Sequence, residues 1–491
     1  MPTTGGASTV SEARDETAGD PDSSPLTVDP NIVLAVLVSG AFVVILNQTL
    51  LNTALPAFMG DFGITANSAQ WVTTVFMLVN GIMIPVTAYL IQRFSTRSLY
   101  FAAMGLFTAG TVLCALAPVY PMLLLGRVVQ AAGGGIILPL MQTILFAVFP
   151  RDRRGRAMGM FGLVISFAPA IGPSLSGWIV DHLPWQVLFW MMVPIAVLVM
   201  AVAWFILKNI SESRPHHLDV LSVVLSTLAF GGMLFGFGNA GNTGWSSPEV
   251  LVPLIIGGIT LVLFIHRQLT LPDPVLELRV LRHVTFTLGT VLGMLVFVAM
   301  IGGMMMIPLY VQNMTDHSAM QSGLVLLPGA IVMGLMSPLT GRAFDCYGAR
   351  WLCVIGFALV AVSTVPLSML RADTSLLLIA AANAVRMLGT AMVIMPVTTA
   401  ALNHLPSSLI PHGTAVNNTL RQIAASVGTA VLITVMTASA LDPATHGAQG
   451  PIHGVNVAFL VSGVVALLGM VGGFFLVGTR PMPEAARTGR S

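Results

Sequence analysis

The chain has 491 residues, of which 55% are hydrophobic and only 8% are charged. A soluble protein of this length needs far more ionisable surface, so the composition excludes an ordinary soluble protein and places most of the chain in lipid. The net charge is +2 and no long basic run occurs, which gives no indication of nucleic-acid binding. The three cysteines (Cys114, Cys346, Cys353) have neither disulfide nor metal-site spacing, and a packing role fits them.

Residues 1–30 differ from the rest of the chain. They are acidic, rich in Ser, Thr, Gly and Pro, and almost free of large apolar side chains, so they cannot bury enough surface to fold. They also lack the basic start and apolar core of a signal peptide. We therefore predict a disordered tail that is retained.

Apolar stretches of about 20 residues or more recur along the remainder of the sequence, as membrane-spanning helices require. They predict an all-α integral membrane protein with 14 spans, near 31–55, 70–92, 98–117, 121–149, 156–180, 185–207, 219–238, 248–266, 285–311, 319–341, 351–370, 375–402, 413–439 and 455–478. The connections are too short for a nucleotide-binding domain, and no Gly-rich phosphate loop with its lysine is present. ATP-driven chemistry is excluded on these grounds.

The basic residues orient these spans. With the N-terminus placed in the cytoplasm, one of the 21 Lys and Arg residues, Arg371, falls in an outer connection and three fall within spans, which leaves 17 in the inner connections and tails. The positive-inside rule requires such a bias. Both termini are predicted to be cytoplasmic.

The first span carries hydrogen-bonding side chains but no charge. At about 100° per residue, Gln48, Thr49, Asn52 and Thr53 occupy one arc of roughly 140°, with Asn47 beside it. Such an arc must face protein or water. We expect it to line a cavity; hydrogen bonding between helices is the alternative.

Three arginines lie inside predicted spans, where a charge costs roughly 2.5–3.5 kcal/mol on insertion scales. Arg127, Gln130 and Gly134 share a face in "GRVVQAAGGGIILP". Asn383, Arg386 and Gly389 share a face with similar spacing in "NAVRMLGTAMVIMP". The similarity suggests two related halves with the arginines beside a hydrated cavity. The alternative is that these side chains extend to the membrane interface; for Arg421 the two interpretations are equally open.

Another stretch, "SFAPAIGPSLSGWIVD", concentrates helix-interrupting residues. Pro removes a backbone donor and Gly permits close approach, so this helix is expected to bend and pack tightly. An ordinary kink is the simpler interpretation. The residues concerned are Pro169, Gly172, Pro173 and Gly177.

None of the 19 acidic residues lies deep in a predicted span. Asp345 and Asp181 come closest, at opposite membrane boundaries. We expect Asp345 to pair with Arg342 or Arg350 and to lock an inner gate. Asp181, next to His182, could titrate at the outer mouth, although a helix-end role fits equally well.

Residues 31–478 resemble the major facilitator superfamily, and in particular its 14-span drug:proton antiporters. "GRVVQAAGGGIILP" is similar to the family's fourth-helix motif, whose arginine is assigned to proton coupling, and "APAIGPSLSG" is similar to the fifth-helix antiporter motif, thought to seal the outer face. "NTALP" resembles the end of the first-helix motif. "SPLTGRAFDCYGARW" resembles the cytoplasmic loop motif of the C-terminal half, with matching positions at Gly341, Arg342, Asp345, Gly348 and Arg350.

The chain also departs from the family pattern. Asn47 stands where the first helix usually has an acid, and Gln92 and Ser95 stand where the loop motif of the N-terminal half commonly has Asp and Gly. "LNQTLLN" together with "LIQRFSTR" looks like the subgroup that includes lincomycin-resistance exporters. No residue is thereby identified as the proton carrier.

The resemblance implies two six-helix bundles, residues 31–208 and 271–478, with a two-helix insert at 209–270 and cytoplasmic tails at 1–30 and 479–491. It implies a secondary active multidrug or antibiotic exporter of the bacterial plasma membrane, a drug:proton antiporter working by alternating access. The implied partners are an amphiphilic drug or metabolite, the proton and the lipid bilayer; we expect a functional monomer with no cofactor or metal. Export of a dedicated metabolite or lipid, or export not driven by protons, is the alternative, and a channel or a membrane enzyme is disfavoured.

Site residues are expected in three groups besides the loop motif. Substrate-cavity candidates are Asn47, Gln48, Thr49, Asn52, Arg386 and Arg421. Proton-coupling candidates are Arg127, Gln130 and Asp181. Gate candidates are Pro169, Gly172, Pro173 and Gly177.

Overall fold

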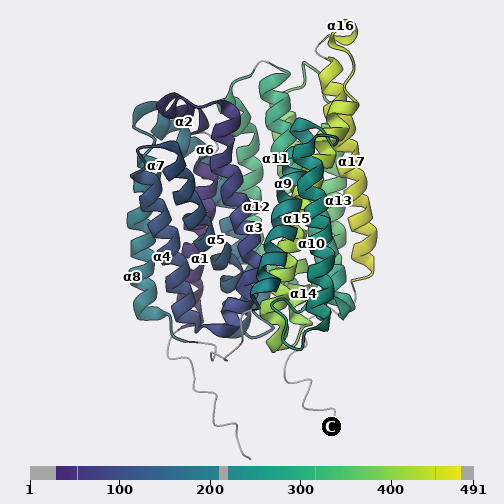
Figure 1. Cartoon of the computed structure of the whole chain (residues 1–491). Helices are drawn as coiled ribbons and strands as arrows, with labels where there is room; N and C mark the ends of the chain where they lie inside the picture. Colours follow the sequence, from purple (N-terminus) through teal and green to yellow (C-terminus); the bar gives the residue numbers. More distant parts are fainter. Residues whose placement is uncertain (1–28, 52–53, 210–218, 316, 448, 477–491) are drawn as a thin grey trace, which may run out of the picture.

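The computed structural model describes residues 29–51, 54–209, 219–315, 317–447 and 449–476. These residues form helices and their connections, and no strand occurs among them. In chain order the elements are α1 (Pro30–Leu50), α2 (Leu55–Phe62), α3 (Ala66–Arg93), α4 (Thr96–Ala115), α5 (Tyr120–Val148), α6 (Arg154–His182), α7 (Val187–Trp190), α8 (Met192–Ile206), α9 (Val220–Thr243), α10 (Pro248–Thr270), the 3₁₀ turn η1 (Leu278–Arg282), α11 (Val284–Asn313), α12 (Ala319–Tyr347), α13 (Ala349–Leu367), α14 (Leu376–Asn403), the 3₁₀ turn η2 (Ser407–Leu409), α15 (Ile410–Ala438), α16 (Pro443–His446) and α17 (Gln449–Phe474) (Figure 1).

The predicted spans are confirmed as helices. Within the described residues, 13 helical segments are long and apolar enough to cross a membrane, with α7 and α8 forming one of them. The remaining predicted span, 156–180, coincides with the 29-residue helix α6. Because a helix satisfies its own backbone hydrogen bonds, it is the form that such apolar stretches take in lipid.

The first span ends earlier than its hydropathy suggests. We expected it to continue to residue 55, but α1 stops at Leu50 and the short helix α2 starts at Leu55, with Pro56 in its first turn. Proline lacks the N–H that would continue the earlier helix and fits the first turn of a new one. Asn52 and Thr53 lie outside the described residues.

Two groups of helices pack side by side. The helices α1, α3, α4, α5, α6 and α8 pack among themselves, as do α11–α15 and α17. Between the groups, α6 packs along α12, while α3 and α5 pack against α15. These contacts agree with two six-helix bundles, and the exact domain boundaries stay predictions.

The insert helices occupy one of these seams. Helix α9 packs against both α3 and α15, and α10 packs on α9 (Figure 1). Gly232 and Gly257 allow α9 and α10 to cross at close range, because a Cβ on Gly232 would lie 3.0 Å from the Gly257 Cα. At the end of this pair, Arg267 forms an ion pair of 2.7 Å with Asp219, and this hydrogen bond lowers the pKa of Asp219 to about 2.

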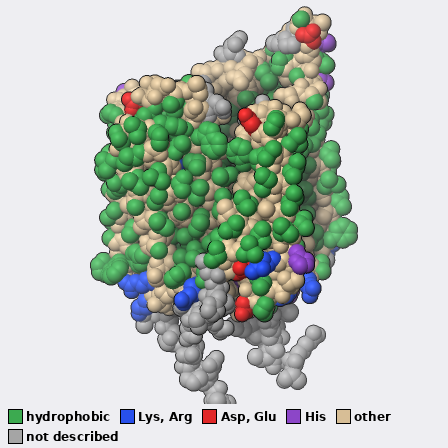
Figure 2. Space-filling model, viewed as in Figure 1, with side chains coloured by type: hydrophobic (Ala, Val, Ile, Leu, Met, Phe, Trp, Pro, Cys, Tyr) green, Lys and Arg blue, Asp and Glu red, His purple; other side chains and the backbone are tan. Residues whose placement is uncertain are grey.

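We call the end of the array where α1 begins and α17 ends the terminal face, and the opposite end the far face. Figure 2 shows a broad apolar band with Lys and Arg side chains gathered at the terminal face. Arg151, Arg153 and Arg156, in the connection between α5 and α6 and at the start of α6, are exposed there. This surface is that of a multi-pass membrane protein.

Candidate functional site

A buried polar network joins four helices around Arg127 of α5, whose side chain is 0% exposed. Its Nε donates to the Val72 carbonyl of α3 at 3.0 Å, and its Nη1 donates to Asn47 Oδ1 of α1 at 2.9 Å and also to Gln130 Oε1. The Gln130 amide in turn donates to Thr111 Oγ1 of α4 at 2.7 Å. Arg127 therefore fixes the mutual positions of helices that are distant in sequence.

Among the described residues, no carboxylate pairs with this charge. Asn47 stands where the family that the sequence resembles usually has an acid. Its neutral amide accepts a hydrogen bond but cannot take up a proton near neutral pH. The Phe76 ring lies 4.1 Å from the guanidinium carbon and supplies a partial cation–π interaction. Arg127 Nη2 and Asn47 Nδ2 are buried without a hydrogen-bond partner among the described residues.

The described hydrogen-bonding side chains of α1 (Asn47, Gln48 and Thr49) do not face one common surface. Asn47 is 1% exposed and faces Arg127, whereas the Thr49 hydroxyl bonds to the Leu46 carbonyl of its own helix at 2.9 Å and lies 3.3 Å from the Ala168 carbonyl of α6. Gln48 is half-buried, and its side chain makes no hydrogen bond to another described residue. Thr49 thus serves interhelical bonding, the alternative that the sequence left open, and a cavity role stays a prediction for Gln48.

Helix α6 runs unbroken through its Pro- and Gly-rich stretch. Gly172 lies directly on α1, because a Cβ there would be 2.3 Å from Thr49 Oγ1, so a glycine is required for this close approach. Gly177 has open space around its Cα, and Pro169 is half-buried. The side chain of Pro173 lies outside the described residues. The gate role of this stretch stays a prediction.

A second arginine centre lies in the other helix group. Arg386 of α14 is 0% exposed; its Nη2 donates to the Ala299 carbonyl of α11 and lies 3.2 Å from Ser462 Oγ of α17. Gly303 of α11 makes room for it, since a Cβ there would lie 2.3 Å from Nη1. Arg386 therefore ties α11, α14 and α17 together, as Arg127 ties α1, α3, α4 and α5.

Arg421 of α15 is 6% exposed, and its guanidinium carbon lies 4.7 Å from the centre of the Phe297 ring of α11. Asn417, one turn earlier, donates to Thr290 of α11 at 3.2 Å. The neighbouring Asn418 instead donates to Gln142 of α5 at 2.8 Å and so joins the two helix groups. The face of α15 that bears these residues lies between the groups, which agrees with an interior position for Arg421.

The loop-motif acid Asp345 has a different partner from the one predicted. Its carboxylate oxygens accept the backbone N–H groups of Gly155 at 2.8 Å and Arg156 at 2.9 Å, at the start of α6. Neither Arg342, which is exposed, nor Arg350, which lies over the Trp351 ring, pairs with it. The expected partner was wrong because the N-terminus of α6 presents unpaired N–H groups and the positive end of its dipole at this point.

Two glycines of the motif shape this contact. Gly341 touches the backbone of α6, where a Cβ would lie 2.2 Å from the Gly155 carbonyl oxygen. Gly348 ends α12 with φ +79°, a conformation that L side chains rarely adopt. They allow α12 to come close to α6 and then to turn sharply into α13.

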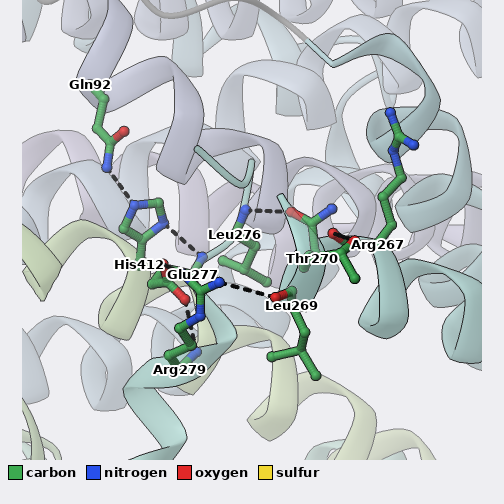
Figure 3. A network of polar contacts seen from close by, with 9 residues as sticks. Gln92, Arg267, Leu269, Thr270, Leu276, Glu277, Arg279 and His412 are labelled. Carbon is green, nitrogen blue, oxygen red and sulfur yellow. Dashed lines mark hydrogen bonds and ion pairs between the residues drawn. The ribbon is translucent and has the colours of Figure 1, made fainter. Parts of the chain in front are cut away.

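The equivalent position of the other half, Gln92 on α3, lies against the first turn of α15. Its amide is in hydrogen-bond contact with His412 Nε2, and His412 Nδ1 accepts the backbone N–H of Glu277 at 3.1 Å (Figure 3). At the same face Arg154 of α6 donates to Asn403 of α14 at 2.9 Å. Sequence reasoning missed His412 and Asn403, and the position of Gln92 in a repeated motif was the one signal that could have indicated this contact.

The family model of the Major Facilitator Superfamily matches residues 37–429. The chain belongs to the major facilitator superfamily. It is 52% identical to the uncharacterised MFS-type transporter YcnB of Bacillus subtilis, over 91% of this chain and 95% of the relative. It is 41% identical to the lincomycin resistance protein LmrB of Listeria monocytogenes, over 91% of this chain and 97% of the relative.

Solved structures support the facilitator fold. The proton:xylose symporter XylE superposes with a TM-score of 0.65 at 14% identity, covering 92% of this chain and 96% of the symporter. The third proton-coupling candidate of this facilitator, Asp181, is exposed near the end of α6. Its side chain makes no hydrogen bond or ion pair with another described residue, and its neighbour His182 stacks on Trp178. The structure therefore does not bring Asp181 into the Arg127 network.

Proposed function

We propose that this facilitator is a secondary active exporter of antibiotics or other amphiphilic small molecules, driven by protons and working by alternating access. The likeness to the lincomycin resistance protein over nearly the whole chain supports this substrate class. The proposed orientation places the terminal face in the cytoplasm of a bacterium, in line with the basic side chains gathered there. Monomeric operation is part of the proposal.

One observation carries the mechanism. At the terminal face, the two helix groups meet through contacts that can separate without unfolding either group: Asp345 on the N-terminus of α6, Gln92 on His412, and Arg154 on Asn403. When one of these contacts separates, water can solvate the polar groups on both sides. The described conformation is, on this proposal, the one closed to the cytoplasm, and separation of these contacts opens it.

A second candidate, export that is not driven by protons, is favoured by Asn47. In an antiporter with a titratable acid beside the buried arginine, proton uptake by the acid releases the arginine. The neutral amide of Asn47 cannot provide that step. A proton-driven mechanism for this chain therefore requires a carrier outside the Arg127 network, and Asp181 and His182 are the proposed places to look.

The test uses purified protein in sealed liposomes, with accumulation of radiolabelled lincomycin followed under an imposed gradient, acidic inside. Proton antiport predicts accumulation above protein-free liposomes that collapses on addition of a protonophore. Replacement of the exposed Arg371 by Gln is the matched control for Arg127→Ala, which is expected to abolish accumulation. Accumulation that the protonophore leaves unchanged refutes proton coupling, and the absence of accumulation refutes proton-driven export of lincomycin.

A further inference from the structure

The insert helices α9 and α10 contact both helix groups, but by different kinds of interaction. Their contacts with the second group (α11–α15 and α17) include hydrogen bonds. Midway along α9, the Ser426 hydroxyl of α15 donates to the Leu234 carbonyl at 3.3 Å. Near the far face, Trp245 Nε1, in the connection between α9 and α10, donates to Thr434 Oγ1 of α15 at 2.7 Å. Directional bonds therefore attach the insert to α15 at two depths of the membrane.

The connection between α10 and α11 supplies a third attachment, at the terminal face. The Leu276 N–H donates to Gln268 Oε1 of α10 at 3.0 Å, and both residues are buried. The next N–H, that of Glu277, donates to His412 Nδ1 at the start of α15 at 3.1 Å (Figure 3). Because buried hydrogen bonds are costly to leave unmade, α10 cannot move away from α15 without breaking this connection.

The contacts of the insert with α3 of the first group (α1, α3–α6 and α8) are apolar. The Trp71 ring of α3 stacks on the Phe235 ring of α9, with centroids 5.6 Å apart. Below it, Leu234 lies on Gly81, where a Cβ would be 2.3 Å from the Leu234 Cδ1. Among the described residues, the hydrogen bonds of α3 to other helices go to α5 and α15 and not to the insert. Apolar side chains can exchange neighbours as helices slide, without breaking a directional bond.

The insert also covers polar groups at the seam between α3 and α15. Gln422 and Ser426 are one turn apart on α15, and Gln422 Cγ lies 3.8 Å from the position of a Cβ on Gly81 of α3. Lipid at this seam would leave such groups without hydrogen-bond partners. Instead α9 lies against them, and α10 presents exposed apolar side chains such as Ile255 and Ile259 on its outer surface.

From this asymmetry we propose that α9 and α10 are a fixed part of the second helix group and act as a sliding seal. When the groups rock against each other, α3 moves along α9, and the seam between α3 and α15 stays closed to lipid. The inference rests on the proposed alternating-access export and gives the insert a part in it. A seal that is hydrogen-bonded to one group only allows this motion, whereas hydrogen bonds to both groups would oppose it.

The contact of Gln92 with His412 shows where the division falls. It joins α3 directly to α15, and its separation is part of the proposed opening of the terminal face. Since His412 also holds the connection that follows α10, the insert is expected to stay with His412 and to move away from Gln92.

The experiment measures distances between spin labels in nanodiscs by double electron–electron resonance, with one label site on each of the three parts. The sites are Leu116 directly after α4, Leu251 on α10 and Leu460 on α17, which are 56, 43 and 55% exposed. They are replaced by Cys two at a time, which gives three pairs. Because all three side chains are exposed, the labels should leave the packing intact.

The exposed Cys346 is replaced by Ser, and the two other cysteines are buried. Each pair is measured with and without Asp345→Asn, which removes a contact that holds the terminal face closed. In this variant the Leu116–Leu251 and Leu116–Leu460 pairs should both gain a second distance population, displaced by about 5 Å. The Leu251–Leu460 pair should keep a single distance.

A second population in the Leu251–Leu460 pair overturns the inference, because the insert would then move relative to the second group. An unchanged Leu116–Leu251 distance beside a changed Leu116–Leu460 distance also overturns it, since the insert would then belong to the first group. Single, unchanged distances in all three pairs remove the motion that a sliding seal must accommodate. The measurement uses neither substrate nor gradient, so a failure to export lincomycin would refute the proposed function and leave these distances unaffected.

Discussion

Replacement of Asp345 by Asn tests whether the contact between α12 and α6 holds the terminal face closed. The carboxylate accepts two backbone N–H groups at the start of α6, at 2.8 and 2.9 Å. Asn keeps one oxygen acceptor but loses the charge and the second bond. The change leaves both helices intact, because the partners belong to the other helix group.

The expected effect follows from the number and type of bonds lost. A hydrogen bond to a charged group contributes about 1.5–3 kcal/mol, and a carboxylate at a helix N-terminus contributes about 0.3–1 kcal/mol by its interaction with the dipole. Losing one bond and the charge should therefore cost the closed state about 2 kcal/mol. This is roughly a 30-fold shift toward the separated state, for example from about 99:1 to roughly 3:1.

The assay follows a reporter cysteine at Ser337 of α12, which is 1% exposed and lies under Gly159 and Gly162 of α6. A maleimide reaches this position only when the helix groups separate, so the labelling rate follows the open population. The exposed Cys346 is replaced by Ser, and the same protein without the reporter gives the background rate.

Asp345→Asn should raise the labelling rate roughly 25-fold, because the open population rises from about 1% to about 25%. The matched control is Asp152→Asn, which removes an exposed acid near the same helix start whose nearest cation is its neighbour Arg153 at 3.9 Å. This control should label at the wild-type rate. Equal labelling of the Asp345→Asn and wild-type proteins would show that the contact of Asp345 with the start of α6 does not stabilise the closed face.

Three further predictions concern other contacts. Gly172→Leu should abolish transport and lower the thermal stability, because α1 leaves no space for a side chain, whereas Gly177→Leu, with nothing within 4 Å of an added Cβ, should keep the wild-type thermal stability; an equal loss of stability in the two variants would contradict the packing argument. Asp219→Asn should lower the melting temperature at pH 7, since the ion pair with Arg267 lowers the pKa of Asp219 in the folded protein below its unfolded value. That stabilisation is present above about pH 4 and is lost as the pH falls toward 2. The difference in melting temperature between the variant and the wild type should therefore disappear over this pH range, and a constant difference would refute the stabilising role of the ion pair. Arg127→Ala should leave a folded protein by gel filtration that no longer transports, and normal transport at wild-type expression would remove Arg127 from the mechanism.

The sequence by itself determined the helices and the family. Hydropathy and length are properties of a single stretch of sequence. In lipid, a single stretch can satisfy its own backbone hydrogen bonds only as a helix, so the positions of the spans can be predicted without knowing which helices lie next to them. The three interior arginines and the repeated motifs could also be recognised from single stretches of the sequence. The break between α1 and α2 was missed, although Pro56 was visible, because apolar residues continue on both sides of it.

Only the tertiary structure decided which groups the polar side chains meet. Asp345 was assigned to arginines close in sequence, whereas its partners are the backbone N–H groups at the start of α6, 190 and 189 residues away in the chain. Asn47 and Thr49 lie on different sides of α1, about 200° apart, and the packing decided that one side faces Arg127 and the other faces α6. Spacing along a helix fixes which residues share a face. Which other helix lies against that face depends on the packing of the whole array, because glycines such as Gly172 allow only particular pairs of helices to come close.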